Sequence, residues 1–209
     1  MKLEVMPPTC TVGTADVIGQ MPSTWAADIR SVVRDHVKAA SLSGDDQSSR
    51  EPSGSSIPYG IVDGRTVIAE LPWLDALYRG PWRRAASEFA GVDLDVARDP
   101  RVGVNLNSLN GAGSRYEMHV DTNPCTGLLF VTTHDPTDGG DLVFSQDRAD
   151  LHIWPKAGTL LVFDARQVPH TVNPLLLDTH RISAPMNYFA KGDPQIRPAL
   201  DDYLYSEGP

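Results

Sequence analysis

The chain has 209 residues, of which 41% are hydrophobic and 22% are charged, and its formal net charge is −9. This length favours a single domain with a substantial core, and the acidic balance argues against nucleic acid as a partner, because phosphate binding needs a cationic surface. The sequence has neither an apolar run of about 18 residues nor a basic-then-apolar leader, so we expect a cytoplasmic protein without a membrane association, whose Cys10 and Cys125 are free thiols.

The first expected element is a helix over residues 23–40. Apolar side chains recur there at helical spacing, and Ser23 or Thr24 can serve as its N-cap (Trp25, Ile29, Val32, Val33, Val37). The next stretch, residues 41–58, contains seven serines and no apolar run. It is expected to be a mobile loop, either disordered or acting as a lid.

Two further helices are expected between Thr66 and Gly91. The sequence "TVIAELPWLDALYRGPWRRAASEFAG" predicts a short helix, a break at Gly80-Pro81, and a second helix that ends at Gly91.

From Arg101 onward the pattern changes to short apolar runs separated by turn residues. The runs are "VGVNLNSL", "YEMHV", "TGLLFVTTH", "DLVFS", "LHIWP", "GTLLVFD", "HTVNPL" and "RISAPMNYFA". Their length and spacing are typical of an antiparallel β-sandwich or barrel. We therefore expect one domain over residues 1–209, in which residues 1–100 form a helical support, residues 101–192 form the β core and residues 193–209 form a tail.

A candidate metal site lies within this β-rich half. His119 and Asp121 are two residues apart in a strand-like segment, so their side chains should share one face, and His170 opens a later strand. Two histidines and one carboxylate make up the facial triad of non-haem Fe(II) oxygenases, whereas a structural zinc site requires four protein ligands.

A candidate carboxylate-binding residue follows eleven positions after His170. On a strand, Arg181, Ser183, Pro185 and Asn187 would share one face. A guanidinium beside a hydroxyl is suited to binding a carboxylate in a bidentate manner.

The ordered set His119-x-Asp121, His170 and Arg181-x-Ser183 resembles the 2-oxoglutarate/Fe(II)-dependent oxygenase superfamily, and its prolyl-4-hydroxylase-like branch in particular. Tyr116, "DGGDLVF" (138–144) and "WPKAGTLLVFD" (154–164) occur in the matching order. The resemblance covers roughly residues 102–190. It implies a double-stranded β-helix, which is a cupin-like jelly roll with the metal between its two sheets.

The resemblance also implies the chemistry. Fe(II) would bind to His119, Asp121 and His170, and 2-oxoglutarate would chelate the iron and extend its 5-carboxylate to Arg181. Oxygen would be reduced as a substrate C–H bond is oxidised, and 2-oxoglutarate would be converted to succinate and CO2. Ascorbate is expected to stimulate the reaction. Because Asp121 is a carboxylate rather than the small residue of related halogenases, hydroxylase-type outcomes are favoured.

Several other residues are candidates for the same pocket. Ser183, Tyr116 and Thr133 are expected to contact the cosubstrate, with Thr132 as the alternative to Thr133. Asn105 and Asn107 alternate on a strand that should run beside the metal strand, and these two amides, Asn187 and Arg166 are candidates for substrate binding.

Two functions remain open at this stage. The favoured one is oxidation of a small molecule, by hydroxylation or oxidative cyclisation of a specialised metabolite or an amino acid derivative, since the chain offers no appended module to hold a peptide. The alternative is a prolyl or other residue hydroxylase acting on a peptide or protein. A β-helix protein that binds without turnover is disfavoured by the complete triad. Carboxylates that could rim the pocket favour an amine-bearing substrate (Glu117, Asp135, Asp201, Asp202).

Overall fold

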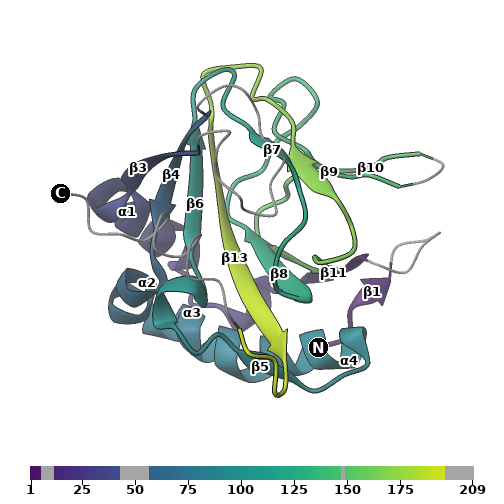
Figure 1. Cartoon of the computed structure of the whole chain (residues 1–209). Helices are drawn as coiled ribbons and strands as arrows, with labels where there is room; N and C mark the ends of the chain where they lie inside the picture. Colours follow the sequence, from purple (N-terminus) through teal and green to yellow (C-terminus); the bar gives the residue numbers. More distant parts are fainter. Residues whose placement is uncertain (6–11, 43–56, 147–148, 196–209) are drawn as a thin grey trace.

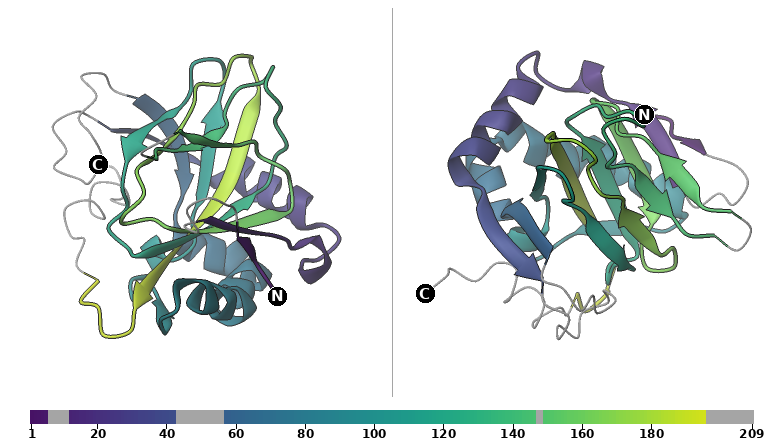
Figure 2. Two further views of the ribbon diagram at one scale, coloured as in Figure 1. Left: turned by 90° about the vertical axis from the view of Figure 1, so that its right-hand side faces the viewer. Right: turned by 90° about the horizontal axis from the view of Figure 1, so that it is seen from above.

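Two antiparallel β-sheets form a sandwich, and the helices cover the outer face of the larger sheet (Figures 1 and 2). The computed structural model describes residues 1–5, 12–42, 57–146 and 149–195. Within these ranges, none of the helices has both the length and the apolar character needed to cross a bilayer.

The large sheet contains nine strands in the described part of the chain. Their spatial order is β1 (Glu4–Val5), β2 (Val12–Asp16), β11 (Thr159–Asp164), β8 (Cys125–Phe130), β13 (His180–Ala190), β6 (Leu106–Asn110), β4 (Ile57–Val62) and β3 (Lys38–Leu42), with β5 (Leu94–Val96) paired to β13. The small sheet has the order β10 (Leu151–Ile153), β9 (Leu142–Phe144), β12 (His170–Val172) and β7 (Tyr116–His119). Every strand expected from residue 101 onward is therefore present.

The helices pack on the side of the large sheet that faces away from the small sheet. They are α1 (Trp25–His36), α2 (Gly64–Glu70), α3 (Pro72–Leu77) and α4 (Arg83–Ala90), with short 3₁₀ helices at Ile18–Gln20 and Pro100–Val102 and a π-helical turn at Tyr78–Trp82. Gly80 has non-helical backbone angles between α3 and α4, and Gly91 ends α4 in the left-handed conformation, as expected. The short helix that was expected between Thr66 and the break at Gly80-Pro81 is divided into α2 and α3, because Pro72 starts a new helix.

Successive side chains of β13 point to opposite faces of the large sheet, so the strand contributes to the layers on both sides. Ile182 and Ala184 point toward the helices and join the helix-side core, whereas Arg181 and Ser183 point into the sandwich. A sheet covered on both faces should be apolar on both. The polar inner face of β13 is the exception, and it lies where the candidate site was expected.

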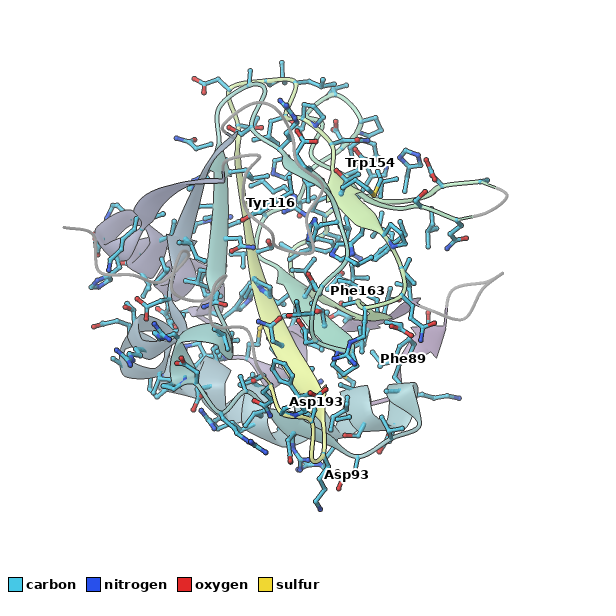
Figure 3. The ribbon with its side chains drawn as sticks, viewed as in Figure 1. Phe89, Asp93, Tyr116, Trp154, Phe163 and Asp193 are labelled. Atoms are coloured by element: carbon cyan, nitrogen blue, oxygen red, sulfur yellow. The ribbon has the colours of Figure 1, made fainter. Side chains whose placement is uncertain are left out.

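The interior of the sandwich is filled by aromatic and aliphatic side chains. Phe144 and Phe163 pack edge to face at 4.9 Å between ring centroids, and Phe163 also meets the His170 ring at 5.0 Å. Tyr116 and Phe163, labelled in Figure 3, come from opposite sheets and both border the interior cavity. This packing gives the candidate site a rigid, water-poor base.

The N-terminal hundred residues are less helical than expected. The helix expected over residues 23–40 ends at His36, and Lys38–Leu42 forms edge strand β3, which pairs with β4. The segments β1, β2, β4 and β5 also belong to the large sheet. Most of the loop that was expected over residues 41–58, namely residues 43–56, lies outside the described residues. The two ends of the expected loop belong to the paired strands β3 and β4.

Cys125 is a free, buried thiol, as expected, and Cys10 lies outside the described residues. Burial raises the pKa of Cys125 to about 12, with a smaller effect from the charge of Asp164, so the thiol stays protonated at neutral pH.

Candidate metal and cosubstrate site

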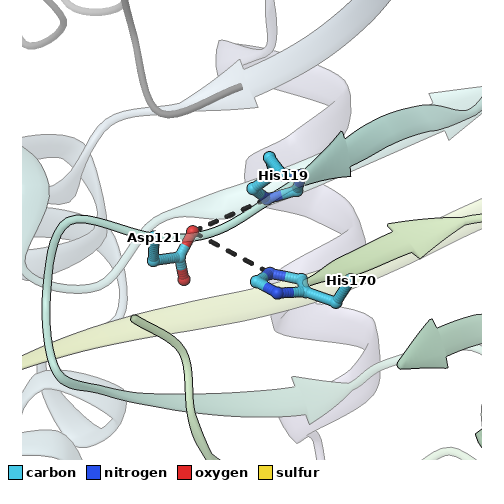
Figure 4. Close-up of side chains that lie close together, drawn as sticks. All are labelled: His119, Asp121 and His170. Carbon is cyan, nitrogen blue, oxygen red and sulfur yellow. Dashed lines mark ion pairs between the residues drawn. The ribbon is translucent and has the colours of Figure 1, made fainter. Parts of the chain in front are cut away.

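Three potential metal ligands, His119, Asp121 and His170, converge in the small sheet (Figure 4). His119 and His170 are direct partners on the antiparallel strands β7 and β12, which places their rings 4.3 Å apart. Asp121 follows just after β7, and its Oδ1 lies 3.5 Å from His119 Nε2 and 3.9 Å from His170 Nε2. An ion about 2.1 Å from each ligand atom can bridge atoms up to about 4.2 Å apart, so both carboxylate–imidazole separations suit one metal ion.

Backbone carbonyls orient both imidazoles. His119 Nδ1 lies 2.7 Å from the Glu117 carbonyl oxygen, and His170 Nδ1 lies 2.9 Å from that of Val168. A carbonyl oxygen only accepts, so in each neutral ring Nδ1 carries the proton and Nε2 presents its lone pair toward Asp121. This is the tautomer that a histidine needs to bind a metal through Nε2.

A chain of hydrogen bonds orients the carboxylate in turn. Thr126 donates its hydroxyl proton to Asp121 Oδ2 at 2.8 Å, and fully buried Asn123 donates from Nδ2 to Thr126 Oγ1 at 2.8 Å. Oδ2 is thereby held away from the histidines, while Oδ1 faces them. The carboxylate thus has a defined direction as well as suitable separations from both imidazoles.

A buried arginine lies in the same cavity as the triad. Arg181 is only 2% exposed; its Nε donates to the Gly140 carbonyl at 2.8 Å and its Nη1 donates to Ser183 Oγ at 3.3 Å. Burial lowers the pKa of Arg181 to about 10, so it is still a cation at neutral pH.

One donor of this arginine is left over, and it provides a test of the expected cosubstrate. Nη2 of Arg181 is buried and has no hydrogen-bond partner in the described part of the chain. An unsatisfied buried donor costs roughly 1–3 kcal/mol, and more for a charged group. A carboxylate reaching Nη2 would supply both the acceptor and the missing negative charge, so the residues fit a dicarboxylate such as 2-oxoglutarate.

The Gly139-Gly140 turn makes this arrangement sterically possible. Both glycines have positive φ angles, of 74° and 79°. A Cβ on Gly140 would lie 2.7 Å from Leu175 Cδ2 and 3.2 Å from Arg181 Cδ. The glycines of the "DGGDLVF" stretch therefore allow the turn to pass close over the arginine, where the Gly140 carbonyl accepts from Nε.

One cavity of about 100 Å³ joins the triad to Arg181. Its lining includes several of the residues expected at the site (Asn105, Asn107, Tyr116, His119, Asp121, His170, Arg181, Ser183, Asn187). The Asn187 amide donates from Nδ2 to the Val102 carbonyl at 2.6 Å, and the Asn105 amide donates from Nδ2 to the Arg101 carbonyl at 2.6 Å. These two bonds fix the orientation of both amides in the wall opposite the triad.

Three expectations at the site are wrong. Thr133 is exposed, does not line the cavity, and accepts a hydrogen bond from the Ala157 amide at 3.0 Å; the alternative, Thr132, bonds to the backbone of Ile182. Arg166 is also exposed and outside the cavity, where it donates to the Thr122 carbonyl and pairs with Asp193. Both residues follow the end of a strand, where alternation no longer predicts which face a side chain takes.

The third wrong expectation concerns β6. This strand, which carries Asn107, pairs with β13 and β4 in the large sheet rather than lying beside β7. Asn105 and Asn107 still border the cavity, because β6 faces the metal strand across the sandwich.

Sequence reasoning missed Thr126 and Asn123. The signal for Thr126 was available, since it alternates with Leu128 and Phe130 and all three therefore face the interior. Asn123 lies before the strand and has no periodic pattern, so only the structure brings it beneath Thr126.

Comparisons with known proteins agree with this geometry. Residues 104–189 match the family model of the 2OG-Fe(II) oxygenase superfamily, while no curated protein matches the chain. Among solved structures, the carbocyclase SnoK from nogalamycin biosynthesis aligns with a TM-score of 0.67 at 14% identity, covering 95% of this chain and 87% of that one.

Two further structures are similar to a comparable degree. The epimerase SnoN, in complex with Fe3+, alpha ketoglutarate and nogalamycin RO, has a TM-score of 0.63 at 15% identity, with 95% and 87% of the two chains covered. A prolyl hydroxylase from Trichoplax adhaerens, in complex with a hypoxia inducible factor peptide fragment, has a TM-score of 0.63 at 16% identity, with 95% and 89% covered.

At such identities these structures establish the shared jelly-roll fold alone. The family model covers the segment that carries the triad, the Gly-Gly turn and Arg181. Over residues 104–189 the chain is therefore similar to the 2OG-Fe(II) oxygenase superfamily, whose members are 2-oxoglutarate-dependent non-haem iron oxygenases.

Proposed function

We propose that the protein oxidises a C–H bond of a small molecule, by hydroxylation or oxidative cyclisation, with release of succinate and CO2. His119, Asp121 and His170 would hold Fe(II), and Arg181 with Ser183 would hold the 5-carboxylate of 2-oxoglutarate. The observation that carries this assignment is the single cavity that joins three convergent metal-ligand atoms to a buried arginine with an unsatisfied Nη2.

Bound iron and 2-oxoglutarate would supply the oxidising chemistry, and the residues of the chain control binding and access. The carbonyls of Glu117 and Val168 keep the histidine Nε2 atoms unprotonated, and Thr126 keeps Asp121 Oδ1 turned toward them. Phe163 packs against the His170 ring and excludes water from behind it.

The small volume of the cavity supports a small substrate. At about 100 Å³ it is well below the roughly 300–1,000 Å³ of sites that take drug-sized ligands, so the cosubstrate would fill most of it. The substrate would then reach the metal from the cavity mouth beside the amide wall of Asn105, Asn107 and Asn187. SnoK and SnoN, which share the fold, are enzymes of nogalamycin biosynthesis.

The amine-bearing substrate remains a prediction without support from the cavity. Asp121 is the only carboxylate residue in its described lining. Glu117 pairs with Arg115 at 2.9 Å, Asp135 bonds to Thr137, and Asp201 and Asp202 lie outside the described residues. Because the amide wall offers neutral donors and acceptors, a neutral substrate with hydroxyl or carbonyl groups fits the lining better.

Hydroxylation of a prolyl or other residue in a peptide is the second candidate. It is favoured by the structural likeness to the prolyl hydroxylase from T. adhaerens, which was solved with a peptide fragment. A peptide would need to lie across the cavity mouth in an extended form, with main-chain hydrogen bonds to a sheet edge or to the amide wall.

The test is succinate formation by the iron-loaded protein. We expect slow succinate release from 2-oxoglutarate without substrate, and its loss in Asp121→Ala, which should keep its fold and melting temperature. A panel of neutral hydroxyl- or carbonyl-bearing and amino-acid-derived small molecules and a panel of proline-containing peptides would then be compared for stimulation. Stimulation by peptides alone would favour the second candidate, and succinate release by an Asp121→Ala protein that retains iron would contradict the assignment of the triad.

A further inference from the structure

A second cavity lies on the opposite side of the large sheet from the candidate active site. This groove, of about 650 Å³, is formed by α1 and by the helix-facing side of β4, β6 and β13. Ile182 lines it, whereas Arg181, the preceding residue on β13, points into the sandwich, so the sheet separates the two cavities. The volume is within the roughly 300–1,000 Å³ typical of sites for small ligands.

The groove is cationic although the chain as a whole is acidic. Arg30 and Arg34 are one turn apart on α1 and both line it, as does His180 at the start of β13. Its described lining contains no aspartate or glutamate, in a chain with a net charge of −9. Such a local reversal of sign concentrates anions at one place on the surface.

The Arg30 charge is not neutralised by any acidic residue that the structure describes. No hydrogen bond or ion pair joins its exposed guanidinium to the described residues, whereas Arg34 pairs with Asp35 at 2.9 Å. Arg30 and His180 both line the groove, and burial, and then the nearby charge of Arg30, lower the pKa of His180. A bound anion would interact favourably with both groups.

The rest of the lining is suited to the other parts of a ligand. The Ser108 hydroxyl lies 2.7 Å from His180 Nε2 and is a donor that an oxyanion can recruit. Val37, the residue after α1, is 39% exposed in the groove, with the buried side chains of Val33 and Ile182 beneath it. Apolar and cationic surfaces therefore meet in one groove.

We propose that this groove is a second binding site, for an organic oxyanion, either a phosphate ester or a carboxylate, attached to an apolar body. Arg30 and Arg34 bind the oxyanion together with the Ser108 hydroxyl, and the apolar body rests on Val37. The inference does not depend on the proposed oxidation reaction, because none of these residues borders the iron and 2-oxoglutarate cavity.

The test is an NMR titration of the His180 imidazole with three probes that share a phenyl ring: phenyl phosphate, benzoate and benzyl alcohol. We expect both oxyanions to shift the His180 signals and to raise its pKa, whereas benzyl alcohol leaves the pKa unchanged. The tighter of the two oxyanions identifies which class the groove prefers.

Matched variants assign the binding to the groove. In Arg30→Gln the dissociation constant for the preferred oxyanion should rise at least tenfold. It should not change in Arg84→Gln, which removes the same charge from an exposed position on α4. Binding should also persist in Arg181→Leu, which excludes the sandwich cavity as the source of the signal.

Three results would overturn the proposal. They are equal affinity in Arg30→Gln and the parent, a His180 pKa shift with benzyl alcohol as large as with the oxyanions, and no shift with any probe at millimolar concentration. Because Arg30 and Arg84 are both exposed, and Arg30 forms no hydrogen bond or ion pair with the described residues, both glutamine variants should keep the melting temperature of the parent.

Discussion

At the scale of single residues, Arg181 combines features that are costly unless a ligand completes them. It is a cation at 2% exposure, it lies 5.6 Å from the centre of the Phe130 ring, and one of its donors is unsatisfied. Removing one partner of a buried charge pair costs roughly 3–5 kcal/mol. Arg181→Leu is therefore expected to weaken 2-oxoglutarate binding at least a hundredfold while leaving the affinity for iron almost unchanged.

Calorimetric titration of the iron-loaded protein with 2-oxoglutarate measures this effect. Arg166→Leu is the matched control, because Arg166 is exposed and bonds to the Thr122 carbonyl outside the cavity. If Arg166→Leu lost the affinity and Arg181→Leu kept it, the assignment of the carboxylate-binding residue would be wrong.

Thr126 is a positioning residue for the metal, because it acts through Asp121. Its hydroxyl holds Asp121 Oδ2, and loss of such an outer hydrogen bond typically costs ten- to a hundredfold in metal affinity. We expect Thr126→Val to weaken Fe(II) binding by about this factor. Thr126→Ser, which keeps the hydroxyl, should restore most of it.

Competition with a chelator gives the Fe(II) dissociation constants of these variants. Thr133→Val is the control, since among the described residues Thr133 bonds at the surface to the backbone of Ala157 alone. Equal iron affinity in Thr126→Val and the parent would mean that the geometry of Asp121 does not depend on this hydrogen bond.

At the scale of elements, the pairing of β7 with β12 makes His119 and His170, which are 51 positions apart in the sequence, direct cross-strand neighbours. A slip of one residue in this register would turn one imidazole to the other face of the sheet. The turn before β9 has a similar role for Arg181, because Gly140 must allow the chain to pass close to the guanidinium.

The prediction at this scale concerns that turn. Gly140→Ala is expected to lower the melting temperature and to weaken 2-oxoglutarate binding, because the new methyl group meets Leu175 and Arg181. Gly113→Ala is the control: its φ of 86° imposes the same backbone strain, roughly 1–2 kcal/mol, but no atom lies within 4 Å of its added Cβ. Thermal melts and cosubstrate titration separate the strain common to both variants from the steric effect on Arg181.

If both glycine variants lost the same stability and kept the same affinity, close packing of the turn on Arg181 would have no functional consequence. Loss of 2-oxoglutarate affinity in Gly140→Ala alone is the expected result.

At the scale of the whole molecule, His134 and His180, each of which lies near an arginine, couple the stability of the fold to pH. Burial lowers the pKa of His134 from 6.5, and nearby Arg181 lowers it further. Burial also lowers the pKa of His180. A histidine with a lowered pKa in the folded state binds fewer protons than in the unfolded chain, so its contribution to stability is present above pH 6.5 and is lost as the pH falls below it.

We therefore expect the melting temperature to decrease between pH 7.5 and pH 5.5, and to decrease less in His134→Gln. The glutamine can still donate to the His180 carbonyl, which His134 Nε2 contacts at 3.4 Å, but it does not titrate. Differential scanning calorimetry at several pH values measures the difference. An identical pH dependence in both proteins would assign the effect to other groups.

The sequence alone determined the features that depend on residue type and local spacing. The strands after Arg101 were predictable, because their apolar runs are short and separated by turn residues. The convergence of His119, Asp121 and His170, and the inward direction of Arg181, were predictable from period-two alternation and from the family pattern. The resemblance to the superfamily follows from the order of these motifs, and the family model matches the same segment.

Only the tertiary structure decided the features that depend on which strands pair. Lys38–Leu42 has no strand pattern of its own and becomes β3 because β4 supplies its hydrogen-bond partners. Thr126 supports the metal ligand, whereas Thr133, seven residues later, lies at the surface beyond the end of β8, where strand alternation no longer holds. The cationic groove likewise brings together residues of α1 and β13 that are about 150 positions apart in the sequence. They meet because α1 packs on the face of the large sheet to which β13 belongs, and no local sequence pattern predicts this contact.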